Sequence, residues 1–258
     1  MLIALTDALS FRYSLRRSLR KNFFLLLAIL GMGFLHAQAP NKTDEKGRKQ
    51  GVWAKYHENG NLRYEGVFKD DKPEGVFKYY TEDGKLKMIA FYFDQGRRSR
   101  AKALHPESQK ILSTGNYWEQ KKDSVWNYYN DEGVLIAIES YNKGVKHGKW
   151  IWNYADGIVS EHVEYKDGSK HGEFKQFFPD GKLKSSGKYV DGKLEGKFQF
   201  FDKAGNVTSE GMYKNDLREG VWYHYRKDGN IERTETFING ISQNPVEFNP
   251  VKIKEEDE

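Results

Sequence analysis

Apolar side chains recur along this chain with a period of 24 residues from residue 51 onward. One column, 17 positions into each copy, is aromatic throughout: Phe68, Tyr92, Tyr117, Tyr141, Tyr165, Tyr189, Tyr213 and Phe237. A second column, 11 positions in, is aliphatic: Leu62, Leu86, Ile111, Leu135, Val159, Leu183, Val207 and Ile231. Chance does not keep such columns in step over eight copies, so the chain is a tandem repeat.

Each copy has the composition of a β-hairpin. Aromatic-rich segments such as VWAKYH end at Asn-Gly or Asp-Gly pairs, which supply the positive φ angles of tight hairpin turns: residues 59–60, 83–84, 156–157, 180–181 and 228–229. The pattern predicts an all-β fold, an elongated antiparallel meander of about eight 24-residue β-hairpin repeats over residues 51–243. Two strands per copy predict about sixteen strands.

One copy, near residues 100–123, departs from the pattern. The column two residues into each copy holds Trp or Phe elsewhere, and Lys102 is expected to occupy it here. Gln109 replaces the turn glycine of this copy, and Ser124 replaces the glycine that opens the next one. We expect a bend or a weak point here, near Pro106.

The N-terminal segment has the three parts of a secretory signal peptide. Basic residues from Arg12 to Lys21 precede the apolar run FFLLLAILGMGFL, and small residues follow it. The run is shorter than the ~20 residues of a membrane-spanning helix. We therefore expect a helical signal peptide at 1–37, cleaved after Ala37, then a linker at 38–50; an uncleaved anchor is the alternative. The chain is expected to be exported to the periplasm, the outer envelope or the extracellular space. An acidic tail is expected at 244–258.

Charge argues against a nucleic-acid partner. The whole chain carries a net charge of +5, but five basic residues and one acid lie in the predicted signal peptide. The remaining chain has 37 basic and 36 acidic residues, which are interleaved. Near-neutrality does not suit binding to many phosphates, and a membrane surface is an improbable partner for the same reason. The sequence contains no cysteine, so it forms no disulfide.

No motif for catalysis or cofactor binding interrupts the repeat. His147 and His171 fall in the same column, so they are candidates for a shared metal, but solvated turn residues are the simpler interpretation. The sequence has no glycine-rich phosphate loop opening a helix and no nucleophile motif. We expect no enzyme activity, no cofactor and no metal site.

Adjacent aromatics on the first strands must point to opposite faces of the sheet. One set is expected to pack across strands, and the other to form an exposed binding face. The candidate residues for this face are Trp53, Trp126, Trp150, Trp152, Trp222, Tyr80 and Tyr129.

The recurring pattern G-x-W/F-x-x-Y-x-x-D/N-G-x-L, followed by Y-x-x-G-K-x-x-G, resembles the MORN repeat, in its bacterial variant. Residues 189–196, YVDGKLEG, show the ending best. The resemblance implies an array of hairpins that serves as a scaffold or binding surface, with no catalytic residues of its own. Some bacterial relatives are labelled as antitoxins.

These observations favour an exported, non-catalytic repeat scaffold that binds a partner, expected to be a protein, through an aromatic-lined sheet face. An antitoxin-like protein that neutralises a toxic partner is one alternative. A carbohydrate-binding envelope protein, with sugars stacked on rings such as Trp150, is another. Unpaired edge strands would also allow self-association edge to edge.

Overall fold

The structure is a computed structural model that describes residues 40–243. Over these residues the chain forms one open antiparallel sheet in which consecutive strands pair. Its strands are β1 (Lys42–Thr43), β2 (Lys49–Tyr56), β3 (Leu62–Lys69), β4 (Lys72–Tyr80), β5 (Leu86–Phe93), β6 (Arg98–Leu104), β7 (Ile111–Trp118), β8 (Lys121–Tyr129), β9 (Leu135–Asn142), β10 (Val145–Lys146), β11 (Gly148–Asn153), β12 (Val159–Lys166), β13 (Ser169–Phe177), β14 (Leu183–Val190), β15 (Lys193–Leu194), β16 (Gly196–Phe201), β17 (Val207–Lys214), β18 (Leu217–Tyr225), β19 (Ile231–Ile238) and β20 (Ile241–Ser242).

The predicted all-β hairpin array is confirmed. Short strands β10 and β15 each belong to the same pass of the chain as the strand that follows, so the sixteen predicted passes run from β2 to β19. Within residues 40–243, no helix has the length and apolar character needed to cross a membrane. The predicted signal peptide, residues 1–37, and the predicted tail, residues 244–258, lie outside the described residues.

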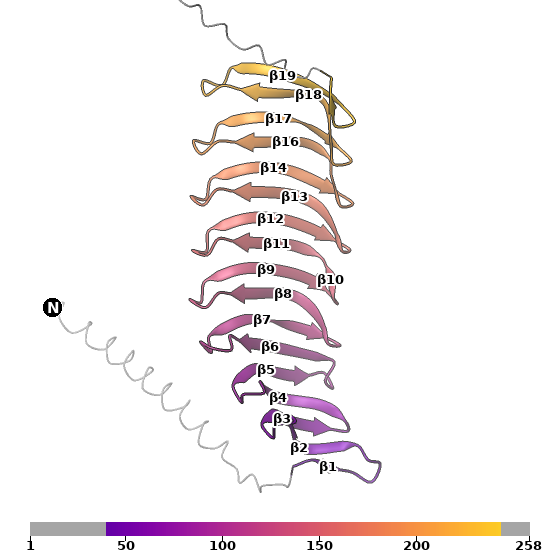
Figure 1. The fold of residues 1–258 in the computed structure, drawn as a ribbon. Helices are drawn as coiled ribbons and strands as arrows, with labels where there is room; N and C mark the ends of the chain where they lie inside the picture. The colour runs from indigo at the N-terminus through magenta and orange to yellow at the C-terminus, as the bar shows by residue number, and fades with distance from the viewer. Residues whose placement is uncertain (1–39, 244–258) are drawn as a thin grey trace, which may run out of the picture.

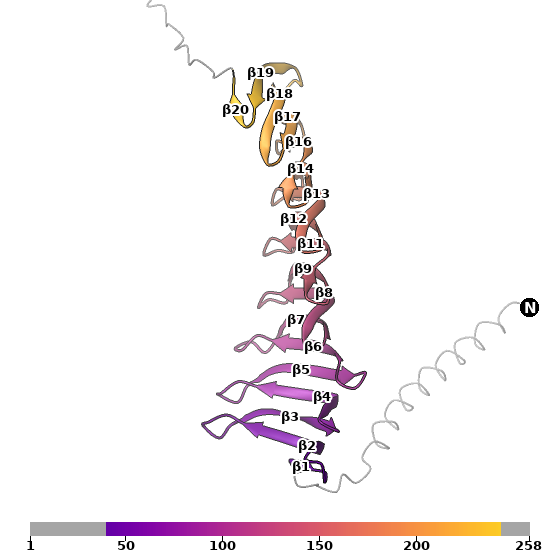
Figure 2. The same ribbon diagram turned by 90° about the vertical axis from the view of Figure 1, so that its right-hand side faces the viewer.

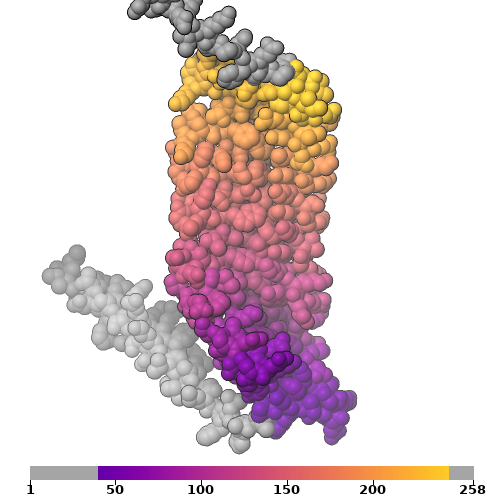
Figure 3. All heavy atoms as spheres, viewed as in Figure 1, coloured from indigo at the N-terminus to yellow at the C-terminus, as the bar shows by residue number. Residues whose placement is uncertain are grey.

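The sheet is long and strongly twisted. Figure 1 shows the strands stacked like rungs from β1 at one end to β19 at the other. After a quarter turn, β2 to β5 lie across the view while the later strands are seen nearly end-on, as Figure 2 shows. In the space-filling view the first copies are offset to one side of the axis of the later ones (Figure 3).

Two kinds of turn line the two long edges of the sheet. At the hairpin edge, turns lie within a copy: the backbone N–H of His57 donates to Asn61 (2.8 Å), and Gly60 N–H donates to His57 (3.0 Å). At the junction edge, which joins one copy to the next, Asp70 and Asp71 both have positive φ (52° and 66°). Asp71 N–H donates to the carbonyl of Lys49 in the preceding copy (3.2 Å), so successive junction turns stack.

A β-bulge at the start of each regular copy determines where the ring on its first strand lies relative to the preceding strand. Gly75 has a φ of 68°, and the register of β3 on β4 shifts between Glu65 and Val67. The ring of Phe77 thereby lies over Gly66 on the neighbouring strand, where an added Cβ would overlap the ring. Trp222 covers Gly211 in the same way. Gly66 and Gly211 therefore have no side chain where a large ring packs directly on the backbone.

All the buried side chains lie on one face of the sheet, which we call the ladder face. The buried hydrophobic residues are Phe77, Ala90, Ala101, Trp126, Trp150, Val163, Phe174, Phe198, Trp222 and Phe237. The aromatic column 17 residues into each copy packs edge-on against these rings, for example Tyr213 on Trp222 at 5.3 Å. The opposite side of the sheet is called the outer face below.

Cationic side chains cover the ladder at the junction edge. Lys146 Nζ lies 4.3 Å from the ring centroid of Trp150, and Lys49 lies 4.8 Å from that of Trp53. Arg218 lies over Trp222 at 4.4 Å. These cation–π contacts and the long apolar stems explain how rings are buried in a single-layer sheet.

The degenerate copy keeps its strands but loses its ring. Ser99, not Arg100, pairs with Tyr117 as the opening residue of this copy, and Ala101 takes the buried position opposite Gly115. The expectation that Lys102 holds this position was therefore wrong by one residue: Lys102 is exposed. The extra residue lies instead in the hairpin turn, where His105 N–H donates to Lys110 across a loop one residue longer than the turn from His57 to Asn61.

Two substituted turn positions behave as the repeat predicts. Gln109 has a φ of 56° and Ser124 a φ of 59°, so both adopt the left-handed conformation of the glycines they replace. The structure also places β1 and the start of β2 inside the predicted linker, because Lys42 and Thr43 pair with Gln50 and Lys49.

Candidate binding surface

The predicted binding-face residues do not share one surface. Trp126 and Trp150 are 3% exposed and Trp222 is 0% exposed, so they belong to the core of the ladder face. Their indole Nε1–H groups donate to backbone carbonyls: Trp126 to Asn116 (2.9 Å), Trp150 to Ser140 (2.9 Å) and Trp222 to Met212 (3.2 Å). With ring and polar atom both satisfied, these three residues offer no exposed ring to a ligand.

The other four predicted residues are partly buried on different faces. Trp53 donates to the carbonyl of Lys42 (3.1 Å), and Trp152 packs against Trp150 at 5.7 Å, both on the ladder face. Tyr80 and Tyr129 lie on the outer face by strand alternation, and the Tyr80 hydroxyl donates to Glu65 there (3.0 Å). A surface made of all seven residues is therefore not formed.

The two candidate histidines do not converge. His147 Nδ1 lies 3.6 Å from Asp167, and His171 Nδ1 lies 3.4 Å from Asp191, which is the same contact repeated in successive copies. In residues 40–243 there is no group of three or more His, Cys, Asp or Glu side chains that could hold a metal ion.

A row of exposed apolar side chains crosses the outer face of the first two copies. Val52 pairs with Val67, and Val76 pairs with Phe91, on four adjacent strands from β2 to β5. Their exposed fractions are 39%, 40%, 51% and 50% in that order. We call these four residues the apolar row.

The same row is charged in the middle of the array. Its members there are Lys149, Glu164, Glu173, Lys188 and Lys197, which pair as Lys149 with Glu164 and Glu173 with Lys188. Solvated ion pairs are the ordinary surface of a repeat scaffold, whereas a continuous apolar row exposed to water marks an interaction site. Of the described copies, only the N-terminal ones have apolar side chains at all four successive positions: at the C-terminal end, Met212 (49% exposed) and Val221 (42% exposed) occupy two such positions, but they pair with Lys197 and Thr236.

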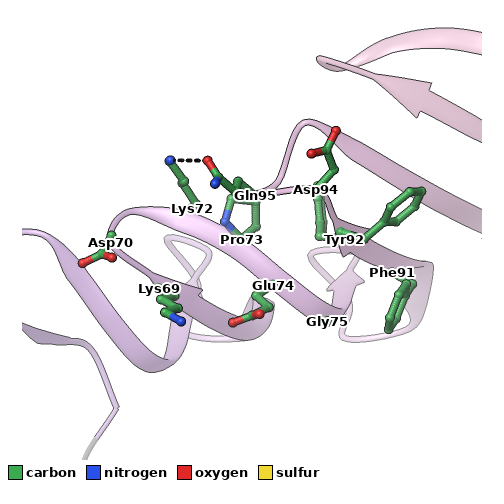
Figure 4. A pocket seen from close by; sticks show the side chains of 11 residues that line it. Lys69, Asp70, Lys72, Pro73, Glu74, Gly75, Phe91, Tyr92, Asp94 and Gln95 are labelled. Carbon is green, nitrogen blue, oxygen red and sulfur yellow. Dashed lines mark hydrogen bonds between the residues drawn. The ribbon is translucent and has the colours of Figure 1, made fainter.

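A pocket of about 450 Å³ opens beside the apolar row at the junction edge. Phe91, Phe93 and Pro73 contribute apolar walls, and Lys72 closes the rim with a 2.8 Å hydrogen bond to Gln95 (Figure 4). The β5–β6 connection is longer here than the other junction turns, because Phe93 pairs with Arg98 across four intervening residues. The absence of the bulge at Ser99 lengthens this turn and shapes the pocket.

Two further hollows surround the degenerate copy. One of about 210 Å³ lies on the ladder face between Tyr92 and Tyr117, where Ala101 replaces the large ring. Another of about 460 Å³, at the hairpin edge, is lined by Tyr79, Met88 and other residues. Burial and a 2.8 Å hydrogen bond to Tyr92 raise the pKa of Tyr79 above its ordinary value.

The apolar row was missed in the sequence because attention went to tryptophan, the largest ring. The available signal lay in two columns taken together: Val52 and Val76 stand opposite Val67 and Phe91, whereas Val125 and Val221 in the same column stand opposite Ser140 and Thr236. The difference between apolar residues in the first copies and polar or charged residues in later ones indicates a binding surface only when these positions are known to lie on the outer face.

The family model for the MORN repeat variant matches six stretches of the chain: residues 49–70, 73–94, 146–167, 170–191, 194–215 and 218–239. The chain therefore belongs to the MORN repeat variant family, as the sequence pattern indicated. Between residues 94 and 146 the model has no match, yet strands β6 to β9 continue the same sheet there.

The chain is also similar to parts of three solved toxin structures. They are the crystal structure of TcdB2-TccC3-Cdc42 (12% identity, 78% of this chain, 13% of that chain, TM-score 0.23), the Photorhabdus luminescens Tc holotoxin pore (11%, 77%, 13%, 0.21) and the crystal structure of TcdB2-TccC3 (12%, 78%, 14%, 0.23). This chain thus spans about one seventh of those chains or less, and at these TM-scores the likeness carries no inference about function. No curated protein matches the chain.

Proposed function

We propose that this MORN repeat scaffold is exported, is non-catalytic, and binds a protein partner through the outer face of its N-terminal copies. The observation that carries the proposal is the apolar row, two cross-strand pairs on four adjacent strands whose side chains are each 39% to 51% exposed. Burying such a row against a partner releases water from apolar surface at about 25 cal/mol per Å². The neighbouring pocket would accept a protruding side chain, the usual anchor of a protein interface.

Site-specific photocrosslinking tests the binding proposal. A photoreactive phenylalanine analogue at position 76 would lie in the apolar row, and one at position 173 would occupy the equivalent site in a later copy, where Glu173 is charged. In living cells we expect a discrete protein adduct from position 76 and none from position 173. Equal labelling at both positions, or none at either, would overturn the proposal.

Export rests on the sequence pattern of residues 1–37 and needs its own test. Cell fractionation with N-terminal sequencing should find the native chain outside the cytoplasm, starting at Gln38. A cytoplasmic chain that retains residues before Phe23 would reject export and return the antitoxin alternative to consideration.

No structural observation favours the carbohydrate alternative. Sugar binding by ring stacking needs an exposed ring face, and Trp150 is 3% exposed. The apolar row contains one aromatic residue, Phe91, beside three valines, which suits a protein side chain better than a sugar ring.

A further inference from the structure

Strand β6 carries three basic side chains in succession on the outer face. Arg98, Arg100 and Lys102 are all exposed, and the residues between them, Ser99 and Ala101, are buried on the ladder face. Across the strand pair, the three basic residues lie opposite Phe93, Phe91 and Ile89 of β5. A basic row therefore runs directly beside Phe91, the last member of the apolar row.

This arrangement occurs on no other first strand of the described copies. The equivalent three positions are His171, Glu173 and Lys175 on β13, and Glu219, Val221 and Tyr223 on β18. Elsewhere the first of the three is acidic, glutamine or histidine: Gln50, Glu74, Asp123, His147 and Glu195. The basic row is a departure from the repeat, in the same copy that has lost its ring.

Aromatic side chains hold the two arginines in place. The guanidinium carbon of Arg98 lies 4.6 Å from the Trp118 ring, and that of Arg100 lies 5.9 Å from the Phe93 ring. Phe93 in turn stacks on Phe91 at 6.3 Å. A guanidinium stacked on a ring keeps its N–H groups free for a planar, bidentate carboxylate.

Nearby carboxylates neutralise little of the positive charge on this strand. Asp94 is the only acid between residues 91 and 102, and it contacts Arg97 (2.8 Å) and Arg98 (3.8 Å). Within residues 40–243, neither Arg100 nor Lys102 has an ion-pair partner. Since the chain without its predicted signal peptide is nearly neutral, this is a local excess of positive charge.

We propose that the outer face from β4 to β7 binds an acidic protein segment that also carries apolar side chains. Carboxylates of the segment would meet Arg98, Arg100 and Lys102, and its apolar side chains would cover Phe91 and enter the pocket beside it. This inference rests on the proposed function and names the chemistry of the partner.

Acidic residues on the same surface favour a protein segment over an anionic membrane. Asp70, Glu74 and Asp94 line the pocket on the junction-edge side of Phe91 together with Lys69 and Lys72, so this part of the surface has mixed charge. A uniformly negative bilayer matches such a surface poorly, whereas a protein segment places its own charges point by point. The basic row would thus contact the acidic end of the segment, and the pocket would accept its apolar part.

Peptide selection on the chain from Gln38 to Glu258 tests the proposal. A phage library of random 12-residue peptides would be selected on the wild-type protein, and enriched peptides would be synthesised for anisotropy titrations. We expect sequences rich in Asp and Glu with Phe, Leu or Ile among them. Their affinity should fall as salt rises, since exposed ion pairs are screened within about 8 Å at 0.15 M ionic strength.

Charge reversal provides the decisive comparison. The double variant Arg100→Glu and Lys102→Glu should weaken peptide binding at least about tenfold. Lys149→Glu is the matched control, because Lys149 is exposed at the position of β11 that corresponds to Arg100 in β6. It should bind as the wild type does, and circular dichroism should be the same for all three proteins. Enrichment without acidic residues, or equal loss in both variants, would overturn the proposal.

Vesicles of phosphatidylglycerol and phosphatidylcholine serve as the competing probe. Co-sedimentation of the wild type that is lost in the double variant, with no acidic peptide enriched, would overturn the proposal in favour of a lipid surface. The two levels of inference fail separately. Crosslinking at position 76 that survives charge reversal rejects only the acidic segment, whereas absence of crosslinking at position 76 rejects the proposed function.

Discussion

At the scale of single residues, the fold depends on large rings packed against backbone that has no side chain. Trp222 is fully buried in a sheet of one layer because Gly211 lets the ring approach and Met212 accepts its N–H. Arg218 covers the other side of the ring at 4.4 Å. The Trp222 ring is therefore held by three neighbours with separate roles.

Gly211→Ala should destabilise the protein by about 1–3 kcal/mol, because the added Cβ would overlap the ring of Trp222 and force it from its place. Urea unfolding followed by tryptophan fluorescence measures the change. Thr208→Ala, at an exposed position on the same strand, should leave the unfolding midpoint almost unchanged. A Gly211→Ala variant as stable as the wild type would show that the ring moves freely.

His162 should make stability depend on pH in mildly acid solution. Burial lowers its pKa below 6.5, against the opposing effect of Glu173, whose Oε2 lies 3.7 Å from Nδ1. Lys149 and Lys175 also lower this pKa, and Glu164 raises it. Because the unfolded chain then binds a proton more readily than the folded one, stability should fall as pH drops below 6.5.

Replacing His162 by Gln removes this titration, so the loss of stability between pH 6.5 and about 5 should become smaller. Thr208→Ala is the control at an exposed site: it alters no titratable group, so its pH profile should match that of the wild type. Unfolding midpoints in urea at several pH values provide the measurement. Identical profiles for His162→Gln and the wild type would exclude a role for this histidine.

At the scale of elements, the first strand of the array needs protection along its open edge. The segment from Asn41 to Arg48 supplies it: Asn41 N–H donates to Val52 (2.9 Å), and the Asn41 side chain accepts from Ala54 N–H (2.9 Å). Arg48 anchors the segment through Asp44 (2.6 Å) and Asp70 (2.9 Å). β1 thus covers part of a sheet edge that would otherwise be free to pair with another chain.

A chain that starts at Lys49 should therefore self-associate more than one that starts at Gln38. Removal of residues 38–48 frees backbone groups of Val52 and Ala54 for pairing with a second copy. Analytical ultracentrifugation over a range of concentrations distinguishes the two chains. Equal sedimentation of both would show that the cap has no protective effect.

At the scale of the whole molecule, the array has one interruption in its ladder of rings. Between Phe77 and Trp126 the buried side chains are those of Ala90, Ser99, Ala101 and Ser113. An aromatic side chain buries about 150–250 Å², far more than alanine or serine. Since each copy is stabilised mainly by its neighbours, this part of the sheet receives the least support.

Amide hydrogen exchange should reveal this difference. Backbone amides of β5 and β6 should exchange faster than those of β12 and β13, which contribute Val163 and Phe174 to the cluster of buried residues. Mass spectrometry of the native protein after timed labelling measures both regions in one sample, so the later copies act as the internal control. Equal protection of amides along the whole array would contradict the prediction that the degenerate copy is less stable.

Much of the fold could be predicted from the sequence because its determinants are local. Asn-Gly and Asp-Gly turns and the alternation of Leu62 with Phe68 act within a few residues, and the period carries them through the chain. The positive φ of Ser124 and Gln109 shows that even substituted turn positions obey the repeat. The sequence also indicated the degenerate copy correctly as the place where the pattern breaks.

The site could not be predicted in the same way, because exposure depends on neighbouring strands. Trp150 and Tyr80 look alike in a list of aromatic residues, but the first is covered by Lys146 and Tyr165, while the second lies on the opposite face. The register of β6 was missed by one residue for a related reason. An extra residue can be absorbed in a strand or in a turn, and only pairing shows that it lies in the loop before Lys110.

The sequence by itself determined the repeat, the hairpins, the family and the position of the degenerate copy, since each follows from periodic local preferences. The tertiary structure alone decided which rings are buried, which residues form the apolar row, and that Arg98, Arg100 and Lys102 lie beside Phe91. Burial in a single-layer sheet is set by bulges and by side chains from adjacent copies. These contacts join residues on neighbouring strands, and the pairing of the strands cannot be read from a local pattern.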